Sequence, residues 1–250
     1  MRDQKSGAES LYTDEFYQGQ VDESAASAAV VIPLLLELTP VRSVVDVGCG
    51  VGTWCEQFLA CGVPEVLGID GAHVNKNLVR LPAGCILTHD LIMPLQLERR
   101  FDLAICMEVA EHLPKERAAS LVADLARLAP CVVFSAAVPG QGGTGHINEQ
   151  YLSYWVALFA AHAYRAVDAL RPLLLGNPAV KWWYQQNTVV FVSPAHPLLK
   201  RNLRAPADLV HPALYEPLRR ANQEPRVGWL LRKLPGALAR SRFNPLRWLN

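Results

Sequence analysis

Two histidines and two glutamates stand out as side chains that could handle protons or ions. Glu108, Glu111 and His112 lie in the segment EVAEHL, and His146 follows in a loop, residues 136–148, that contains four glycines. An imidazole has a pKa near neutrality and can take a proton from a hydroxyl group. His146 is therefore the first candidate for a catalytic general base and His112 the second. Either ring could instead hold its own segment through hydrogen bonds, and both roles stay open.

A second chemical signal is the segment DVGCGVG, residues 46–52, which overlaps the end of an apolar run. Gly48, Gly50 and Gly52 favour a sharp turn with positive φ, at which a ligand can approach the backbone closely. Their G-x-G-x-G spacing differs from the G-x-G-x-x-G of dinucleotide sites. At the mouth of such a loop Asp46 would repel a pyrophosphate and attract a ligand that carries an ammonium group. A tight connection without a ligand is the alternative for this turn taken alone.

These residues need a scaffold, and the chain alternates short β-branched runs with segments of helical period. Lys115–Leu128 carries one apolar stripe, and Val21–Leu38, Thr53–Cys61 and Tyr151–His162 also have helical character. This alternation predicts a three-layer α/β/α sandwich with a mostly parallel, Rossmann-like seven-stranded sheet. The predicted strands are Ser43–Val47, Val66–Ile69, Cys85–Thr88, Leu103–Met107, Cys131–Ser135, Ala166–Leu170 and Tyr184–Val192.

The order and spacing of these features resemble the class I S-adenosylmethionine (SAM) dependent methyltransferases over residues 41–192. Residues 46–52 match the first motif of that family, Asp70-Gly71 ends the second predicted strand, and Asp90-Leu91 follows the third. The resemblance implies that the three acids match the ammonium group, the ribose hydroxyls and the adenine amino group of SAM. The implied cofactor-binding residues are Asp46, Gly48, Cys49, Gly50, Gly52, Asp70, Gly71, Asp90, Leu91 and Met107.

More closely, the chain is similar to a group of small bacterial class I methyltransferases. The shared segments are EVAEHL, GQGGTGHINEQ and WWYQQN, here Glu108–Leu113, Gly140–Gln150 and Trp182–Asn187. This resemblance does not extend to a substrate.

We expect the methyl acceptor beside the loop that follows the fifth predicted strand. Ligands of open α/β sheets bind at the carboxyl ends of the strands, and this loop is long and glycine-rich for a simple connection. Aromatic and amide side chains suit a sugar ring. In a strand, Trp182 and Trp183 would face opposite sides, so only one could line a pocket. Tyr17 belongs to an N-terminal segment expected to cover SAM. The candidate substrate residues are Tyr17, Gln141, Asn148 and Trp183.

The main interpretation requires no metal ion. The set Glu108, Glu111, His112 and His146 nevertheless resembles the ligands of small-RNA 3′-end 2′-O-methyltransferases, in which two Glu and two His hold a divalent ion. Carboxylates with imidazoles would suit Mg²⁺ or Mn²⁺. The pattern EVxEH also occurs in relatives that bind no metal, so the ion stays an alternative.

Composition favours a folded, cytoplasmic protein. Of the 250 residues, 51% are apolar and 19% charged, which excludes wholesale disorder. Six cysteines without a CxxC pair favour reduced thiols. Residues 1–14 lack the apolar segment of a signal peptide, and no apolar stretch approaches the roughly 20 residues of a membrane span.

Charge is distributed unevenly along the chain. Residues 200–250 carry 11 Lys and Arg against 3 Asp and Glu, whereas the preceding residues carry 13 against 20. We expect an N-terminal helical lid over residues 1–40, a methyltransferase domain over 41–195 and a basic appendage over 196–250. Trp229, Leu230 and Leu231 would suit contact with a membrane surface or another protein. The acidic body disfavours a nucleic-acid partner.

The sequence thus predicts a SAM-dependent methyltransferase that acts on a hydroxyl group of a small molecule or saccharide. One alternative is a metal-assisted 2′-O-methyltransferase acting on RNA ends. The other is a SAM-binding protein without transferase activity, which would act as a regulator or partner of other enzymes.

Overall fold

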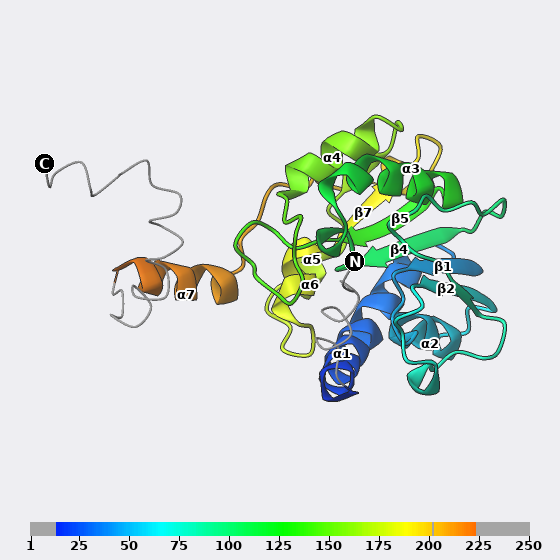
Figure 1. Ribbon diagram of the computed structural model, residues 1–250. Coiled ribbons are helices and arrows are strands. Elements are labelled where there is room, and N and C mark those ends of the chain that lie inside the picture. The colour runs from blue at the N-terminus through cyan, green and yellow to red at the C-terminus, as the bar shows by residue number, and fades with distance from the viewer. Residues whose placement is uncertain (1–13, 202, 224–250) are drawn as a thin grey trace, which may run out of the picture. The chain divides into compact units, whose positions relative to one another are not determined.

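The structure, a computed structural model, describes residues 14–201 and 203–223, with side chains described for 23–201 and 203–220. Contacts divide the chain after Leu209. The first unit is built on one sheet with helices on both faces (Figure 1). The predicted three-layer α/β/α sandwich is therefore confirmed.

The sheet has seven strands in the order β3-β2-β1-β4-β5-β7-β6. Strands β1 to β5 pair in parallel, and β7 pairs antiparallel with both β5 and β6. Parallel strands buried on both faces require continuous apolar runs, and β1, β4 and β5 are buried at every position. The strands are β1 (Ser43–Val47), β2 (Glu65–Asp70), β3 (Ile86–Thr88), β4 (Leu103–Met107), β5 (Cys131–Ser135), β6 (Arg165–Val167) and β7 (Val189–Val192).

Alternate residues of each strand enter two separate cores, because successive side chains of a strand point to opposite faces. In β5, Val132 and Phe134 pack with helices α3 (Ala118–Leu128) and α4 (Leu152–Ala160). Cys131 and Val133 pack on the other face with α1 (Asp14–Leu38) and α2 (Thr53–Ala60). In Figure 1 these two helix pairs lie on opposite sides of the sheet.

Helix α1 belongs to this unit rather than to a separate lid. Ala28, Val31, Ile32 and Leu35 follow the i, i+3, i+4, i+7 spacing of one helical face and are buried in the same core as β1 and α2. The compact unit also extends past the expected boundary at residue 195. Leu198, in the short 3-10 helix Pro197–Lys200, is buried in that core.

One predicted strand is wrong in its first half. Residues Trp182–Asn187 form the helix α6, and the strand β7 begins only at Val189. The aromatic residues have high β propensity, but tertiary hydrogen bonds override it. The Gln185 side chain accepts a hydrogen bond from the Gly176 N–H and donates to the carbonyls of Asn177 and Val180. The strand expected over Ala166–Leu170 is also shorter, because α5 (Arg171–Leu174) begins beside it.

The second unit contains helix α7 (Pro212–Gln223), in which Arg219 pairs with Glu216 at 2.7 Å. Trp229, Leu230 and Leu231, on which the expected membrane or protein contact depends, lie outside the described residues. Within the described part of the chain, no helix combines the length and hydrophobicity that crossing a bilayer requires. All six cysteines are free thiols, as predicted, and four of them are buried.

Candidate functional site

The glycine loop after β1 has the conformation that its sequence predicts. Gly48, Gly50 and Gly52 have φ values of +88°, +54° and +89°. A Cβ atom on Gly48 would lie 2.3 Å from Val109 Cγ2, and one on Gly52 would lie 2.6 Å from Leu81 Cγ. A Cβ atom on Gly50 would meet no atom within 4 Å. The first and third glycines therefore permit close packing, whereas the second faces open space.

That space is a cleft of about 150 Å³ at the carboxyl ends of β1 and β4. Four of the predicted cofactor-binding residues line it: Gly48, Cys49, Gly50 and Met107. The other lining residues were not predicted as cofactor-binding. They are Ser24 of α1, Val51, Thr53, Trp54, Glu108 and Tyr184. The Ser24 and Tyr184 hydroxyl oxygens are 3.2 Å apart, so α1 and α6 meet across the cleft.

Asp70 holds the glycine loop against the end of β2. Its carboxylate accepts hydrogen bonds from the backbone N–H of Gly50 and of Gly71, each at 2.6 Å. Gly50 and Gly71 are both predicted cofactor-binding residues. Asp70 thus shapes the loop, although it is not among the residues that line the cleft.

Asp46 lies beneath the loop and not at its mouth. Only 2% of its surface is exposed, and the Cys55 thiol donates to its carboxylate at 3.6 Å. Burial, reinforced by the nearby Asp70 carboxylate, raises the pKa of Asp46 to about 8. The expectation that Asp46 lies at the mouth of the loop, where it would repel a pyrophosphate, is therefore wrong.

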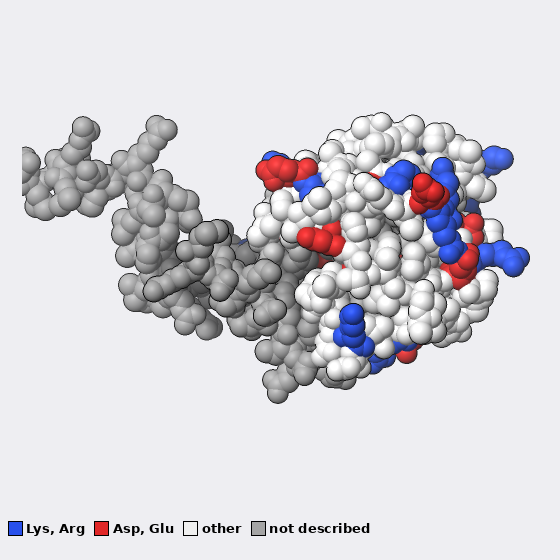
Figure 2. Space-filling view, turned by 45° about the vertical axis from the view of Figure 1, so that its right-hand side comes forward, with Lys and Arg blue, Asp and Glu red and all other residues white. Residues whose placement is uncertain are grey.

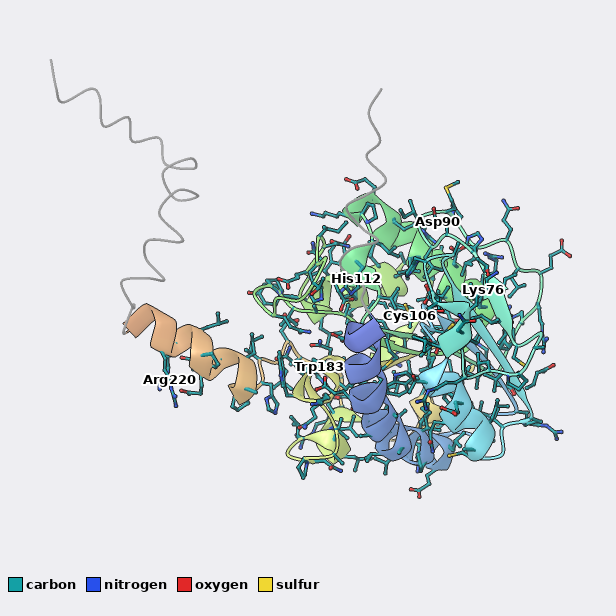
Figure 3. All side chains as sticks on the ribbon, turned by 60° about the horizontal axis from the view of Figure 1, so that its bottom comes forward. Lys76, Asp90, Cys106, His112, Trp183 and Arg220 are labelled. Carbon is teal, nitrogen blue, oxygen red and sulfur yellow. The ribbon has the colours of Figure 1, made fainter. Side chains whose placement is uncertain are left out.

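The third predicted acid, Asp90, also stands apart from the cleft. It is exposed, and its carboxylate accepts the N–H of Ile92 at 3.0 Å in a local turn. Leu91 beside it is buried. In Figure 3, Asp90 is well separated from Trp183, which lies beside α1 and directly precedes the cleft residue Tyr184.

Glu108 links this cleft to the loop after β5. It has a φ of 55°, unusual for a residue with a side chain. Its carboxylate accepts hydrogen bonds from the side-chain amides of Gln141, at 2.9 Å, and Asn187, at 3.0 Å. Burial raises the pKa of Glu108, and these amide donors oppose the increase. An acid directly after the fourth strand was a usable signal, although the sequence pattern pointed to Glu108 only as a metal ligand.

Next to Glu108, three of the residues singled out for their chemistry meet. Glu111 and His112, in the 3-10 helix η2 (Ala110–His112), converge with His146, and one ligand atom from each lies within 4.8 Å of the others. Burial raises the pKa of Glu111, and the adjacent Glu108 raises it further. Burial, together with the neighbouring His146, lowers the pKa of His112 to about 4.

His146 is held by Glu149, a residue that was not among the predicted site residues. The Glu149 carboxylate lies 3.1 Å from His146 Nδ1 and also accepts the N–H groups of Gly140 and Gly142, each at 2.8 Å. Glu149 therefore fixes both the loop and the orientation of the imidazole. Its position three residues after His146 was the only available signal.

The predicted substrate residues have different surroundings. Gln141 bonds Glu108, as described above, whereas Asn148 is buried and supports the loop by donating to the Ala110 carbonyl at 3.4 Å. Trp183 is half-buried, with the Lys181 ammonium 5.8 Å from its ring centroid, and does not line the cleft. The Tyr17 side chain lies outside the described part of the chain.

Comparison with known proteins gives the following matches. Residues 17–188 match a family model described as a methyltransferase domain. A ubiquinone biosynthesis O-methyltransferase of Rhodopseudomonas palustris (strain BisB18) is 30% identical over 126 residues, which cover 47% of this chain and 44% of the relative. In a similar enzyme of Nitrobacter winogradskyi the match covers 28% of the relative. The chain thus spans less than half of the length of these curated relatives.

Among solved structures, the sugar N-methyltransferase KedS8 from Streptoalloteichus sp ATCC 53650 has a TM-score of 0.55 at 18% identity. The match covers 72% of this chain and 92% of that one. SAM-bound CalS10, an amino pentose methyltransferase from Micromonospora echinaspora, has a TM-score of 0.51 at 19% identity, with 73% and 98% covered. At this level of identity the likeness establishes the fold.

Proposed function

The chain belongs to the family of proteins with a methyltransferase domain, and we propose that it transfers the methyl group of SAM to a hydroxyl group of a small molecule or saccharide. The family match covers most of the described first unit, so the predicted class I methyltransferase family is confirmed. The choice of acceptor and of the methylated atom is our proposal.

The cleft supports SAM as the cofactor. It combines a backbone that a ligand can approach at Gly50 with the polar side chains of Ser24, Glu108 and Tyr184. Such a mixture suits a ligand that carries an ammonium, a carboxylate and an apolar chain. When bound, SAM supplies an electrophilic methyl group on a positively charged sulfur.

The observation that carries the choice of a hydroxyl acceptor is the cluster of Glu111, His112 and His146 next to this cleft. A hydroxyl group must lose its proton as its oxygen takes the methyl group, and imidazole or carboxylate groups assist that loss. The cluster lies beyond Glu108, on the side of the loop after β5, where an acceptor would approach. The ubiquinone biosynthesis enzymes to which the chain is similar are O-methyltransferases by name.

The described surface charge favours saccharides or other uncharged acceptors over nucleic acid. On the face shown in Figure 2, most of the described surface is uncharged, and Lys and Arg form only small separate groups. Phosphate backbones are bound by extended basic surfaces. The RNA-end alternative therefore becomes an outcome of the test and not a second proposal.

The test uses the full chain, methyl-labelled SAM and fractionated metabolites of the host. The expected result is label in an uncharged, hydroxylated compound, joined through an ether that resists mild base. Gly50→Ala, which places a methyl group in the cleft, serves as the control and should reduce labelling at a limiting SAM concentration. Label in RNA ends would support the first alternative. SAM binding by calorimetry without label in any fraction would support the non-catalytic one.

A further inference from the structure

The cluster of Glu111, His112 and His146 has unsatisfied acceptor atoms that the proposed reaction does not by itself explain. Glu111 is fully buried, and its Oε1 accepts the Ala137 N–H at 3.2 Å, but its Oε2 has no hydrogen-bond partner of normal geometry, only the neighbouring Glu108 carboxyl group. His112 Nδ1 is likewise buried without a partner. Leaving a buried polar atom unpaired costs about 1–3 kcal/mol, so two such atoms in one cluster indicate a missing ligand.

The hydrogen bonds around both imidazoles leave one lone pair of each directed toward the cluster. His146 Nδ1 faces the Glu149 carboxylate, so its proton belongs on Nδ1 and the lone pair on Nε2. The His112 ring is hydrogen-bonded to the backbone of Gly145 while its Nδ1 stays unpartnered. Imidazoles that ligate metals are held in this way, with the other ring nitrogen donating to a carboxylate or a carbonyl oxygen.

The loop backbone also packs closely against the His146 ring. Gly143 has a φ of +153°, and a Cβ atom there would lie 2.3 Å from His146 Nε2. The imidazole therefore occupies the place that a side chain at residue 143 would take, and glycine there allows the ring its position.

We propose that Glu111, His112 and His146 bind one divalent transition-metal ion, whose remaining positions take oxygen atoms of the methyl acceptor. Binding of the acceptor to the ion rests on the proposed function. Binding of the ion itself does not. Two imidazoles and one carboxylate are a donor set that suits Zn²⁺, Mn²⁺ or Fe²⁺ better than Mg²⁺, which prefers oxygen ligands and water. Three ligands leave coordination positions open, as in catalytic sites.

Glu108 does not belong to this set, although the sequence pattern suggested it. Both of its carboxylate oxygens are already hydrogen-bonded, to Gln141 and Asn187.

Ligands of one tetrahedral ion lie about 3.3 Å apart, less than the 4.8 Å within which the three ligand atoms lie. To bring the three ligand atoms to this spacing, the glycine-rich loop that carries His146 must move slightly, and its glycines permit such a movement.

An ion at this position lowers the pKa of a hydroxyl group that it contacts. The hydroxyl oxygen forms a bond to the methyl carbon, the bond between that carbon and sulfur breaks, and the proton passes to solvent. The sulfur keeps the electron pair and becomes a neutral thioether, so no oxidant or reductant is needed. The ion then replaces a bare His146 imidazole as the group that promotes loss of the proton.

Co²⁺ is the probe for the test, because its visible absorption reports its ligands. The full chain is freed of ions by dialysis against a chelator and titrated with Co²⁺, and then with Zn²⁺ in competition. We expect one Co²⁺ per chain without a thiolate charge-transfer band, since no cysteine belongs to the cluster. His146→Ala and Glu111→Gln should weaken binding by about 100-fold or more. The controls His162→Ala and Glu116→Gln, at exposed positions outside the cluster, should bind as the unmodified chain does.

Several outcomes would overturn the proposal: no saturable binding, binding through thiolates, or equal affinity in His146→Ala. Because Glu111 is buried, Glu111→Gln could fail to fold, and a thermal melt of each variant checks this. His146→Ala, on the loop, keeps the test decisive. SAM affinity is measured by calorimetry on the same samples. Ion binding without SAM binding would contradict the proposed function and leave the ion site standing, and SAM binding without ion binding would do the reverse.

Discussion

The imidazole rings of His112 and His146 pack edge to face, with their centroids 4.8 Å apart and their planes at 87°. One ring follows β4 and the other lies in the loop after β5. These strands are parallel neighbours, paired from Leu103 with Cys131 to Met107 with Ser135. Segments that leave the carboxyl ends of such strands emerge at the same edge of the sheet. The strand order itself therefore brings the two histidines together.

Asp70→Ala should weaken SAM binding by about 1–3 kcal/mol, or roughly 5- to 150-fold, because two backbone N–H groups of the cofactor loop lose their acceptor. Calorimetry gives the affinity. Asp102→Ala is the matched control, since Asp102 also accepts two backbone N–H groups, of Arg42 and Ser43, but at the amino end of β1, opposite the glycine loop. Equal loss of affinity in both variants would show that Asp70 has no specific role in the site.

Gly50→Ala should weaken SAM binding by about tenfold or more, because the added methyl group enters the cleft. Gly142→Ala is the control for backbone strain. Gly142 has a similar φ of +69° and equally open space, but lies outside the cleft. Both variants should lose about 1–2 kcal/mol of stability from the left-handed conformation. Unchanged SAM affinity in Gly50→Ala would place the cofactor elsewhere.

Local patterns made much of the fold predictable. The apolar runs of β1, β4 and β5 have the predicted boundaries, since strands buried on both faces need such runs. The positive φ values of the glycine loop follow from its composition. The order of motifs along the chain then predicted which segments share the carboxyl edge.

Features that depend on tertiary contacts were not predictable in the same way. Helix α6 exists because buried amides such as Gln185 find backbone partners that no local pattern reveals. The burial of Asp46 and the unpartnered Glu111 Oε2 depend on how closely the loops pack above the sheet. Sequence alone therefore predicted that His112 and His146 lie at the same edge of the sheet, but not which polar atoms there lack hydrogen-bond partners.

Asp46→Asn should remove a pH dependence of folding stability. The carboxyl group ionises near its ordinary pKa of 3.8 when unfolded and at about 8 when folded. Between these values the folded state keeps a proton that the unfolded state releases, so the free energy of unfolding falls as pH rises from about 4 to 8 and levels off above 8.

The variant lacks this group, and the difference in stability between it and the unmodified chain should grow from pH 5 to pH 8. The expected gain at pH 8 is on the order of a few kcal/mol, since one pKa unit corresponds to about 1.4 kcal/mol. Urea unfolding at several pH values measures it. Parallel pH profiles for the two proteins would mean that Asp46 ionises normally in the folded state.

Glu149→Ala should impair use of the acceptor while leaving SAM binding intact. The Glu149 carboxylate holds Gly140, Gly142 and His146, so its removal frees the loop and releases the imidazole. Loss of a residue that positions such a ligand typically lowers activity by about 10- to 100-fold. We expect this decrease in kcat/KM for the acceptor, with faster amide hydrogen exchange over residues 138–150.

Glu149→Gln, which keeps one accepting oxygen, should restore part of the activity. Glu116→Ala controls for loss of an exposed acid, and a parallel loss of SAM affinity in Glu149→Ala would argue that Glu149 supports the cofactor cleft instead.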